Sequence, residues 1–398
     1  MPSPDTNTID ARIVVRPRFG IRYNSMISHR IQTPTQIVIG REVMATIARE
    51  QRRANRRRWL LVTEAELHDS GAIDPLVAAF EGAGLSIVTF TGFDSGSVST
   101  AAEEALEISR ASFVEAVIGF GSAPTIHLGR VVAALVGVDV SGVDEILDQS
   151  RIDSRGVAFL SVPSVPFDPL LCSPKAFVVD ARNRLLRMIE LETPAEYVIY
   201  DSKLLDMTTR VQTLFGLSAA MLLSVESLVN PKRDPVSAPL SARVVRDATD
   251  LFKRLSGGDE FDPEVHESVR QLSLMAALGA ASTGPGLGTY LAGCIHARNG
   301  FGLSSAIPAI TSPTVSHLVR SAQETPDLDI IGGDPETVEA NMRELLGGVE
   351  LPLRLKEAGF DERDTSAVLD NLEALKATGQ YAGAVGPEDV ASIIDTAL

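Results

Sequence analysis

The stretch AVIGFGSAPT, residues 116–125, decides the fold of this 398-residue chain. It joins a short apolar run to a helical pattern at 126–136 through Gly119, Gly121 and Ser122. Glycines in such a turn let the backbone approach a ligand closely, and the N terminus of the next helix offers free N–H groups to an anion. The residues therefore predict a strand–turn–helix unit that could hold a phosphate group. A tight connection without a ligand is the alternative.

Short apolar runs alternate with helical patterns on both sides of this unit. Strand-like runs occupy residues 36–40, 59–63, 85–90 and 157–162, and helical patterns occupy 73–83 and 100–109. Alternation of this kind, with nearly continuous apolar strands, predicts a parallel sheet whose two faces are covered by helices. Residues 176–180 and 185–190 are separated by a short polar turn, so we expect them to extend the sheet as a hairpin.

The pattern changes at about residue 200, after which helical spacing dominates. The longest examples are 208–229, 238–255, 263–280, 335–346 and 387–398. We therefore expect a loose lead-in at 1–27, an α/β domain at 28–200 and an all-helical domain at 201–398. The crevice between two such domains is the usual place for a ligand.

Composition excludes several functional classes. The 36 Lys and Arg residues against 52 Asp and Glu residues give a formal charge of −16, which repels phosphate backbones, so no nucleic-acid partner is expected. No apolar run reaches the roughly 18 residues that span a membrane, and the N terminus lacks the apolar core of a signal peptide. We expect a soluble, cytoplasmic protein without a membrane partner. Two cysteines and six histidines leave few ligands for a metal.

Taken in order, these segments resemble the iron-containing (group III) alcohol dehydrogenase family, whose relatives include dehydroquinate synthase. The segments that carry the resemblance are PTQIVIG (34–40), LVT with the following SG (61–71), VIGFGS (117–122), VIYDSKLL (198–205) and the closing helical tail (387–398). The resemblance implies a Rossmann-like parallel-sheet domain followed by a helical domain, NAD or NADP as cofactor, a small-molecule substrate and a homodimer. The pyrophosphate loop would consist of Gly119, Phe120, Gly121 and Ser122, with Phe120 in place of the family's middle glycine.

The metal ligands of that family have no counterparts here. The family holds a catalytic divalent ion with one Asp and three His of the helical domain, and the Asp and the first His lie four residues apart on one helix. The corresponding positions hold Ser218 and Leu222 (Ala219 and Leu223 in the other possible register), Leu291 and Asn299. Because a divalent ion needs several good donors, these departures from the family predict a protein that works without a metal.

Three further positions are expected to contact the cofactor. Thr91 follows the strand at 85–90, close to Asp94, an acidic residue that fits either a bond to a ribose diol or an ordinary turn. Ser164 lies where the family has a glycine-rich loop, which prolines replace in this chain, and it retains a hydroxyl for a phosphate oxygen. Leu205 belongs to the segment that enters the helical domain.

Hydride transfer without a metal needs another group to polarise the carbonyl or to supply the proton. The candidate residues for this role are His296, Arg298 and Asp168. His296 also fits a partly exposed structural histidine, and Asp168, which lies between two prolines, also fits a turn.

The sequence thus predicts a metal-independent, NAD(P)-dependent oxidoreductase of the alcohol dehydrogenase type, acting on a small alcohol, aldehyde or ketone in the interdomain cleft. The alternative is a repurposed or catalytically inactive scaffold that binds a nucleotide or metabolite, or that runs non-redox chemistry. The presence of the glycine turn and of Ser122 favours the first interpretation.

Overall fold

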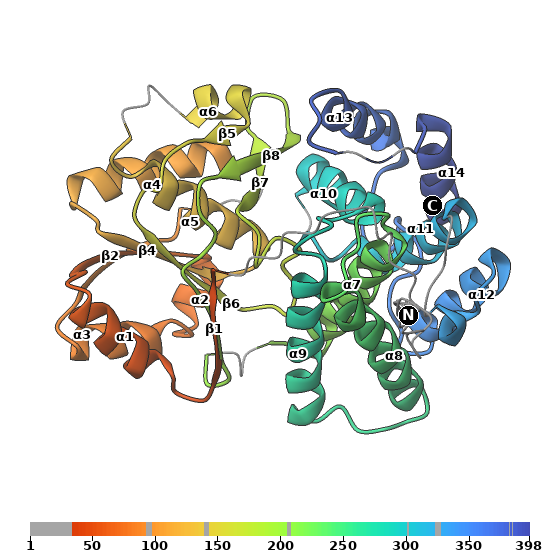
Figure 1. Cartoon of the computed structure of the whole chain (residues 1–398), viewed down its shortest axis with the longest axis horizontal. Coiled ribbons are helices and arrows are strands. Elements are labelled where there is room, and N and C mark those ends of the chain that lie inside the picture. The colour runs from red at the N-terminus through yellow and green to blue at the C-terminus, as the bar shows by residue number, and fades with distance from the viewer. Residues whose placement is uncertain are drawn as a thin grey trace, which may run out of the picture.

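The structure is a computed structural model, and it describes residues 34–92, 98–138, 143–204, 208–300, 302–322, 328–381, 383 and 385–398. The expected lead-in at 1–27, Asp94 and Leu205 lie outside the described residues. Within these ranges the chain forms an N-terminal α/β domain and a C-terminal all-helical domain, as the sequence predicts (Figure 1).

The N-terminal domain is built on a six-stranded parallel sheet. Its strands, in spatial order, are β1 (Gln36–Gly40), β9 (Tyr197–Asp201), β6 (Ala158–Pro163), β4 (Ala116–Gly121), β2 (Arg58–Thr63) and β3 (Ser86–Phe90). All neighbouring pairs run parallel, so the carboxyl ends of the strands meet at one edge of the sheet. Residues that follow β2, β4 and β6 are therefore neighbours in space.

Helices cover both faces of this sheet (Figure 1). The helices that connect its strands are α1 (Met44–Arg53), α2 (Ala65–Asp69), α3 (Asp74–Gly82), α4 (Val98–Ala111), α5 (Ala123–Leu135) and α6 (Val143–Gln149). Alternate residues of β2 enter different cores: Trp59 and Leu61 pack in one core with Phe80 of α3, whereas Leu60 and Val62 pack in the other, with α4 and α5. Burial of both faces accounts for the continuous apolar sequence of the strand.

The hairpin predicted at 176–190 forms, but it is not part of the six-stranded sheet. β7 (Lys175–Asp180) and β8 (Leu185–Leu191) pair antiparallel and, with the short β5 (Arg151–Ile152), make a separate three-stranded sheet. The expectation that this pair extends the main sheet is therefore wrong. The reason is tertiary, because the N–H groups of Leu186 and Met188 donate to the side chains of Asn371 and Gln380 in the helical domain, each at 2.8 Å. The hairpin thus bridges the two domains.

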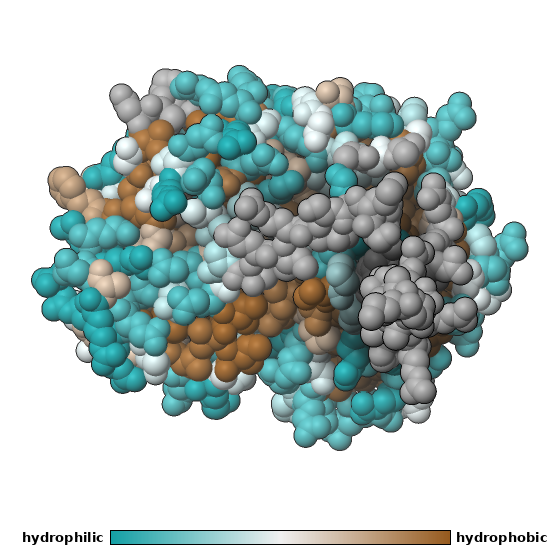
Figure 2. All heavy atoms as spheres, viewed as in Figure 1, coloured by the Kyte–Doolittle hydropathy of each residue, from teal (hydrophilic) through white to brown (hydrophobic). Residues whose placement is uncertain are grey.

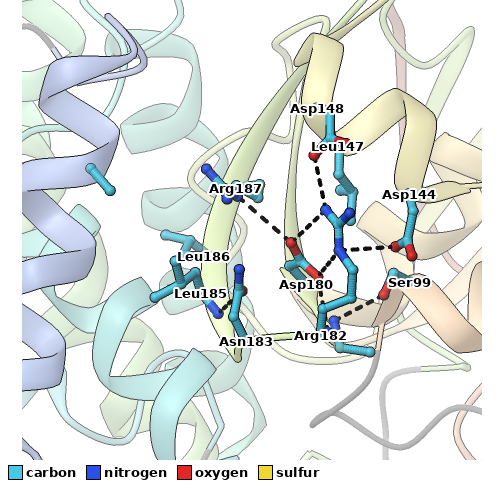
Figure 3. Close-up of polar contacts among 12 residues, drawn as sticks. Ser99, Asp144, Leu147, Asp148, Asp180, Arg182, Asn183, Leu185, Leu186 and Arg187 are labelled. Atoms are coloured by element: carbon cyan, nitrogen blue, oxygen red, sulfur yellow. Dashed lines mark hydrogen bonds and ion pairs between the residues drawn. The ribbon is translucent and has the colours of Figure 1, made fainter.

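A charged network connects the turn of this hairpin to α6 (Figure 3). Asp180, at the end of β7, is fully buried and accepts hydrogen bonds from the Arg182 guanidinium at 2.9 and 3.0 Å. Arg182 also pairs with Asp148 at 3.0 Å and with Asp144 at 3.5 Å, both on α6. Burial alone raises the pKa of Asp180, but the arginine contacts outweigh it and hold that pKa below its usual value.

The C-terminal domain is a bundle of helices arranged around α7. Its helices are α7 (Arg210–Val229), α8 (Ser237–Ser256), α9 (Pro263–Gly279), α10 (Leu287–Asn299), α11 (Ile307–Ser321), α12 (Pro335–Gly347), α13 (Thr365–Ala377) and α14 (Pro387–Ala397), with short 3₁₀ turns at η1 (Asp329–Ile331) and η2 (Glu362–Asp364). Among the described helices, only α7 is long and apolar enough to cross a membrane by length and composition. However, 83% of its apolar window is buried in the protein, as in a core helix.

The face of the molecule shown in Figure 2 is largely hydrophilic, and hydrophobic atoms gather on it where Figure 1 draws β1. β1 is an edge strand of the six-stranded sheet, and its residue Ile39 is 50% exposed. An exposed edge strand presents unpaired backbone groups that another chain can pair with.

Candidate cofactor and substrate site

The turn between β4 and α5 is the centre of the candidate site. β4 ends at Gly121 and Ser122 immediately precedes α5, so the first turn of α5 begins directly at the carboxyl end of the strand. A Cβ atom on Gly119 would lie 3.0 Å from the Phe159 ring and 3.1 Å from the Cα of Ile126. The absence of a side chain at Gly119 therefore allows the close packing of α5 against the sheet.

The carboxylate of Glu64 lies directly against this turn. Its Oε1 accepts hydrogen bonds from the Ser122 N–H (2.8 Å), the Ser122 hydroxyl (2.5 Å) and the Thr125 hydroxyl (2.6 Å). A Cβ atom on Gly121 would lie 2.9 Å from both carboxylate oxygens, so only glycine leaves them this room. The turn therefore fits an anion, and in this structure the anion is a side chain of the protein itself.

Glu64 is not among the site residues predicted from the sequence. It follows β2 directly, and β2 pairs with β4 in the sheet, so the carboxyl ends of the two strands lie side by side. The only sequence signal was an acidic residue at the end of a buried apolar run, 58 residues before Ser122. Without the strand order, that signal does not indicate that the carboxylate meets the glycine turn.

The structure brings Ser164 to the turn but directs the Phe120 side chain away from it. The Ser164 N–H donates to the carbonyl oxygen of Gly121 (2.8 Å), and the Ser164 carbonyl accepts from the Thr208 hydroxyl (3.0 Å). Phe120 is fully buried in the core that includes α1 and α3, so it can offer a ligand only its backbone. Thr91 follows β3, two strands away from β4, and is half-buried.

Asp168, expected as a general base, lies in a buried ionic network. The residue is 3% exposed, and its Oδ1 lies 3.0 Å from Nε2 of His127 and accepts the N–H of Leu170 at 2.8 Å. The Phe177 N–H lies 3.3 Å from Nδ1 of His127, so both ring nitrogens of His127 have a partner. Although burial alone raises the pKa of Asp168, the contacts with His127 and Arg130 outweigh it and hold that pKa below its usual value.

Arg130 completes this network and ties it to the loop that follows β6. Its Nη2 lies 3.9 Å from Oδ2 of Asp168. Its Nη1 donates to the carbonyl oxygens of Leu170 (2.9 Å), Ser173 (3.0 Å) and Lys175 (2.5 Å). The network therefore fastens the loop to α5, and its geometry favours a structural role for Asp168.

His296 lies on the wall of a small cavity between the two domains. The cavity has a volume of about 10 Å³, and its walls include Pro124 and His127 of α5, Leu186 of the hairpin and His296 of α10. His296 is 3% exposed. A space of this size holds about one water molecule. The structure thus places His296 on the same cavity as the first turn of α5, next to the glycine turn.

Arg298 points in another direction although it lies on the same helix turn. Its Nε donates to Oδ1 of Asp364 at 2.7 Å, and its side chain is 42% exposed. Its carbonyl oxygen accepts from Nε of Arg184 at 3.2 Å. The structure therefore does not bring Arg298 to the cavity that His296 lines.

Two of the positions that the resemblance assigns to metal ligands hold apolar side chains. Leu222 and Leu291 are fully buried and carry no donor atom, and the Leu222 side chain fills the space beside α10, where a Cβ atom on Gly288 would lie 2.8 Å from it. In the alternative register Leu223 is equally buried and equally without a donor. Among the residues that the structure describes, no three His, Cys, Asp or Glu side chains gather in a group that could hold a metal ion.

A buried carboxylate lies one helical turn beyond Leu222. Glu226 of α7 accepts hydrogen bonds from the N–H groups of Gly286 (2.9 Å) and Thr289 (3.0 Å) and from the Thr289 hydroxyl (2.7 Å). It therefore caps the N terminus of α10. Burial raises the pKa of Glu226 despite these hydrogen bonds.

The fold is that of a two-domain protein in which an α/β domain precedes an all-helical domain, with the glycine turn at the carboxyl edge of the parallel sheet. Residues 34–202 match the model of the iron-containing alcohol dehydrogenase family. No curated protein sequence matches the chain.

Solved structures share the fold over nearly the whole chain. NADH-dependent butanol dehydrogenase A from Thermotoga maritima is similar with a TM-score of 0.78 and 19% identity, covering 94% of this chain and 99% of that one. Sulfoacetaldehyde reductase from Bifidobacterium kashiwanohense, in complex with NAD⁺, has a TM-score of 0.76 and 15% identity, with coverages of 93% and 98%. Maleylacetate reductase from Agrobacterium tumefaciens has a TM-score of 0.72 and 16% identity, with coverages of 94% and 98%.

Proposed function

We propose that the protein is a metal-independent, NAD(P)-dependent oxidoreductase that interconverts small alcohols with aldehydes or ketones in the interdomain cleft. The observation that carries this proposal is the cavity shared by His296 and the first turn of α5, next to a turn that accommodates an anion. Such a turn suits the diphosphate of a dinucleotide. NADH-dependent butanol dehydrogenase and NAD⁺-bound sulfoacetaldehyde reductase, which share the fold, support the choice of cofactor.

The nicotinamide cofactor, when bound, supplies or accepts the hydride. Ser122 and Ser164 offer N–H and hydroxyl groups to its diphosphate, while Gly119, Phe120 and Gly121 offer backbone. Thr91 is proposed at the ribose end of the cofactor, and Leu205 is also proposed to contact it. These residues either surround the turn or belong to segments that follow β3 and β9.

His296 is the proposed proton donor to the substrate oxygen when a carbonyl is reduced, and the acceptor of that proton when an alcohol is oxidised. Its place on the interdomain cavity supports this role. Arg298 and Asp168 are weaker candidates, because Arg298 pairs with Asp364 at the surface and Asp168 is buried against His127.

We also infer that the protein is a cytoplasmic homodimer that binds a small molecule and neither nucleic acid nor a membrane. The exposed edge of β1, where Ile39 is 50% exposed, supports association between copies. The formal charge of −16 opposes nucleic-acid binding. The apolar side chains of Leu222 and Leu291 at the positions assigned to metal ligands support metal independence.

The first experiment measures cofactor binding and turnover on metal-depleted protein. The protein is dialysed against EDTA and titrated with NADH, NADPH, NAD⁺ and NADP⁺ by calorimetry and thermal shift. Consumption of the reduced cofactor is then followed with a panel of short aldehydes and ketones. We expect saturable binding, and turnover that does not change with EDTA. No response to any of the four nucleotides would refute the proposal.

The second experiment tests the role of His296. His296→Gln keeps the side-chain volume and a hydrogen-bonding group, so it is preferred to Ala for this buried position. We expect kcat to fall by about 100-fold or more, with an unchanged Kd for the cofactor and with loss of the histidine limb of the pH–rate profile. His317→Gln, on α11 and half-buried, is the matched control and should keep wild-type rates. Wild-type kinetics in His296→Gln would rule out this proton donor.

A nucleotide-binding scaffold without turnover is the second candidate. Two observations favour it: Glu64 occupies the anion position of the turn, and the cavity beside His296 has room for about one water molecule. Cofactor binding without consumption across the whole panel would favour this scaffold over the oxidoreductase.

A further inference from the structure

The contact between Glu64 and the start of α5 uses the groups that a bound phosphate would need. The N–H and hydroxyl of Ser122 and the hydroxyl of Thr125 all donate to one oxygen, Oε1 of Glu64. A helix N terminus carries a partial positive charge that attracts one anionic group. A second anion at this position would find the donors of Ser122 and Thr125 already occupied. It would also be repelled by the negative charge of the Glu64 carboxylate.

We propose that Glu64 is a built-in competitor for the diphosphate of a dinucleotide, so that the diphosphate binds only as the carboxylate leaves the N terminus of α5. The inference rests on the proposed function in one respect, namely that a ligand carrying a diphosphate binds at this turn. It goes beyond that function because it assigns to one side chain the control of the ligand's affinity.

Steric and electrostatic reasons both require this exchange. Both carboxylate oxygens of Glu64 lie 2.9 Å from the position that a Cβ atom on Gly121 would occupy, so they fill the space through which a phosphate would approach the glycine backbone. A phosphate oxygen and a carboxylate oxygen cannot share the same donors. The apparent affinity for the nucleotide is therefore the intrinsic affinity multiplied by the fraction of molecules in which Glu64 has left the turn.

The surroundings of Glu64 allow it to leave without disrupting the core. Glu64 is half-buried and has an extended backbone conformation (φ −78°, ψ 148°) immediately before α2. α2 is a five-residue helix with no buried residue, so rotation of the Glu64 side chain towards solvent breaks hydrogen bonds but exposes no apolar core. The contact thus stabilises the nucleotide-free protein at the expense of binding.

The test compares ligand binding by wild type, Glu64→Gln, Glu64→Ala and the control Glu66→Gln. Glu66 is an exposed residue of α2, so the control makes the same change of charge two residues away. Inorganic pyrophosphate and NADH are titrated separately by calorimetry at constant ionic strength. We expect both Glu64 variants to bind each ligand at least about tenfold more tightly than wild type, and Glu66→Gln to bind like wild type.

A double-mutant cycle checks that the contact exists in solution. The stability of the ligand-free protein is measured for Glu64→Gln, Thr125→Val and the double variant by chemical unfolding. Non-additive losses support the contact, whereas strictly additive losses would overturn it.

The outcomes separate this proposal from the proposed function. Pyrophosphate binding that is unchanged in both Glu64 variants overturns the competition, and weaker binding overturns it too, because Glu64 would then assist the ligand. Tighter pyrophosphate binding in Glu64→Gln, with no nicotinamide nucleotide bound by any variant, supports the competition and refutes the oxidoreductase. NADH bound equally by wild type and both Glu64 variants refutes the competition and leaves the oxidoreductase standing.

Discussion

Glu64 accepts hydrogen bonds on one carboxylate oxygen from both the N–H (2.8 Å) and the hydroxyl (2.5 Å) of Ser122, joining the end of β2 to the start of α5. The helical domain contains a matching contact, in which Glu226 of α7 accepts from the N–H (3.0 Å) and the hydroxyl (2.7 Å) of Thr289 at the start of α10. α5 and α10 are also the helices that contribute histidines to the interdomain cavity. Each of these two helices is therefore capped by a glutamate from a neighbouring element.

Glu226→Gln should change how stability depends on pH. Burial raises the pKa of Glu226 in the folded protein. The contribution of the Glu226 side chain to the unfolding free energy is therefore full below the unfolded-state pKa of about 4.3. This contribution is lost as pH rises through the higher folded-state pKa. We expect the unfolding free energy of wild type to fall relative to that of Glu226→Gln as pH rises above this value. Chemical denaturation across the pH range measures the difference.

The control for this variant is Glu344→Gln, an exposed position on α12. Its difference from wild type should stay constant with pH. A constant difference for Glu226→Gln as well would contradict the raised pKa.

Arg182→Met should destabilise the protein at neutral pH by about 1–3 kcal/mol, because it leaves the buried Asp180 carboxylate without its main hydrogen-bond donor. The pKa of Asp180 is lowered in the folded state. Its contribution is therefore present above the unfolded-state pKa of about 3.9 and is lost as pH falls through the lower folded-state pKa. We expect the gap between wild type and Arg182→Met to close on acidification, as measured by urea denaturation.

Arg151→Met is the matched control for Arg182→Met. Its partner is Asp153, and the two side chains are 61% and 71% exposed. Exposed pairs contribute about 0–1 kcal/mol, so this substitution should have little effect at any pH. An equal loss of unfolding free energy in both variants would show that burial of Asp180 does not make its contact with Arg182 more stabilising than an exposed ion pair.

Asp168→Asn should cost about 3–5 kcal/mol of stability, because it leaves Arg130 as a buried charge without its anionic partner. If Asp168 has only this structural role, kcat per folded molecule should stay within a few-fold of wild type. Thermal unfolding and steady-state kinetics on the same preparation measure both quantities. Nearly wild-type stability combined with loss of turnover would instead restore Asp168 as a proton-transfer group.

Removal of divalent metals should leave both stability and activity unchanged. Leu222 and Leu291 offer no donor at the positions where a metal would be held. Elemental analysis after purification, and thermal unfolding with EDTA or added Zn²⁺, check this expectation, since an ion that binds the folded state raises the melting temperature. One tightly bound zinc or iron per chain would contradict it.

Most of the fold follows from local sequence patterns. The apolar runs at 36–40, 59–63 and 116–119 become parallel strands, and the long helical patterns after residue 208 become helices. Hydrophobic spacing is a local property that distinguishes strand from helix. The sequence pattern does not reveal that the hairpin at 176–190 forms a separate sheet, because its partners Asn371 and Gln380 lie nearly two hundred residues further on.

Less of the candidate site than of the fold can be predicted from the sequence. The glycine turn and Ser164 do come together, as the hydrogen bond from Ser164 to Gly121 shows. By contrast, Phe120 faces the core and Arg298 pairs with Asp364. Residue type and order indicate which groups are available, but the direction of a side chain depends on what packs around it.

The sequence by itself determined the two-domain class. The spacing of apolar residues and the glycine turn are local features, each of which extends over only a few residues and sets the local secondary structure. Only the tertiary structure decided which carboxylate reaches which helix. Glu64 meets Ser122 across 58 residues because β2 and β4 are neighbours in the sheet. Glu226 meets Thr289 across 63 residues because α7 packs against α10. Such contacts depend on the order of strands and the packing of helices, which no local pattern specifies.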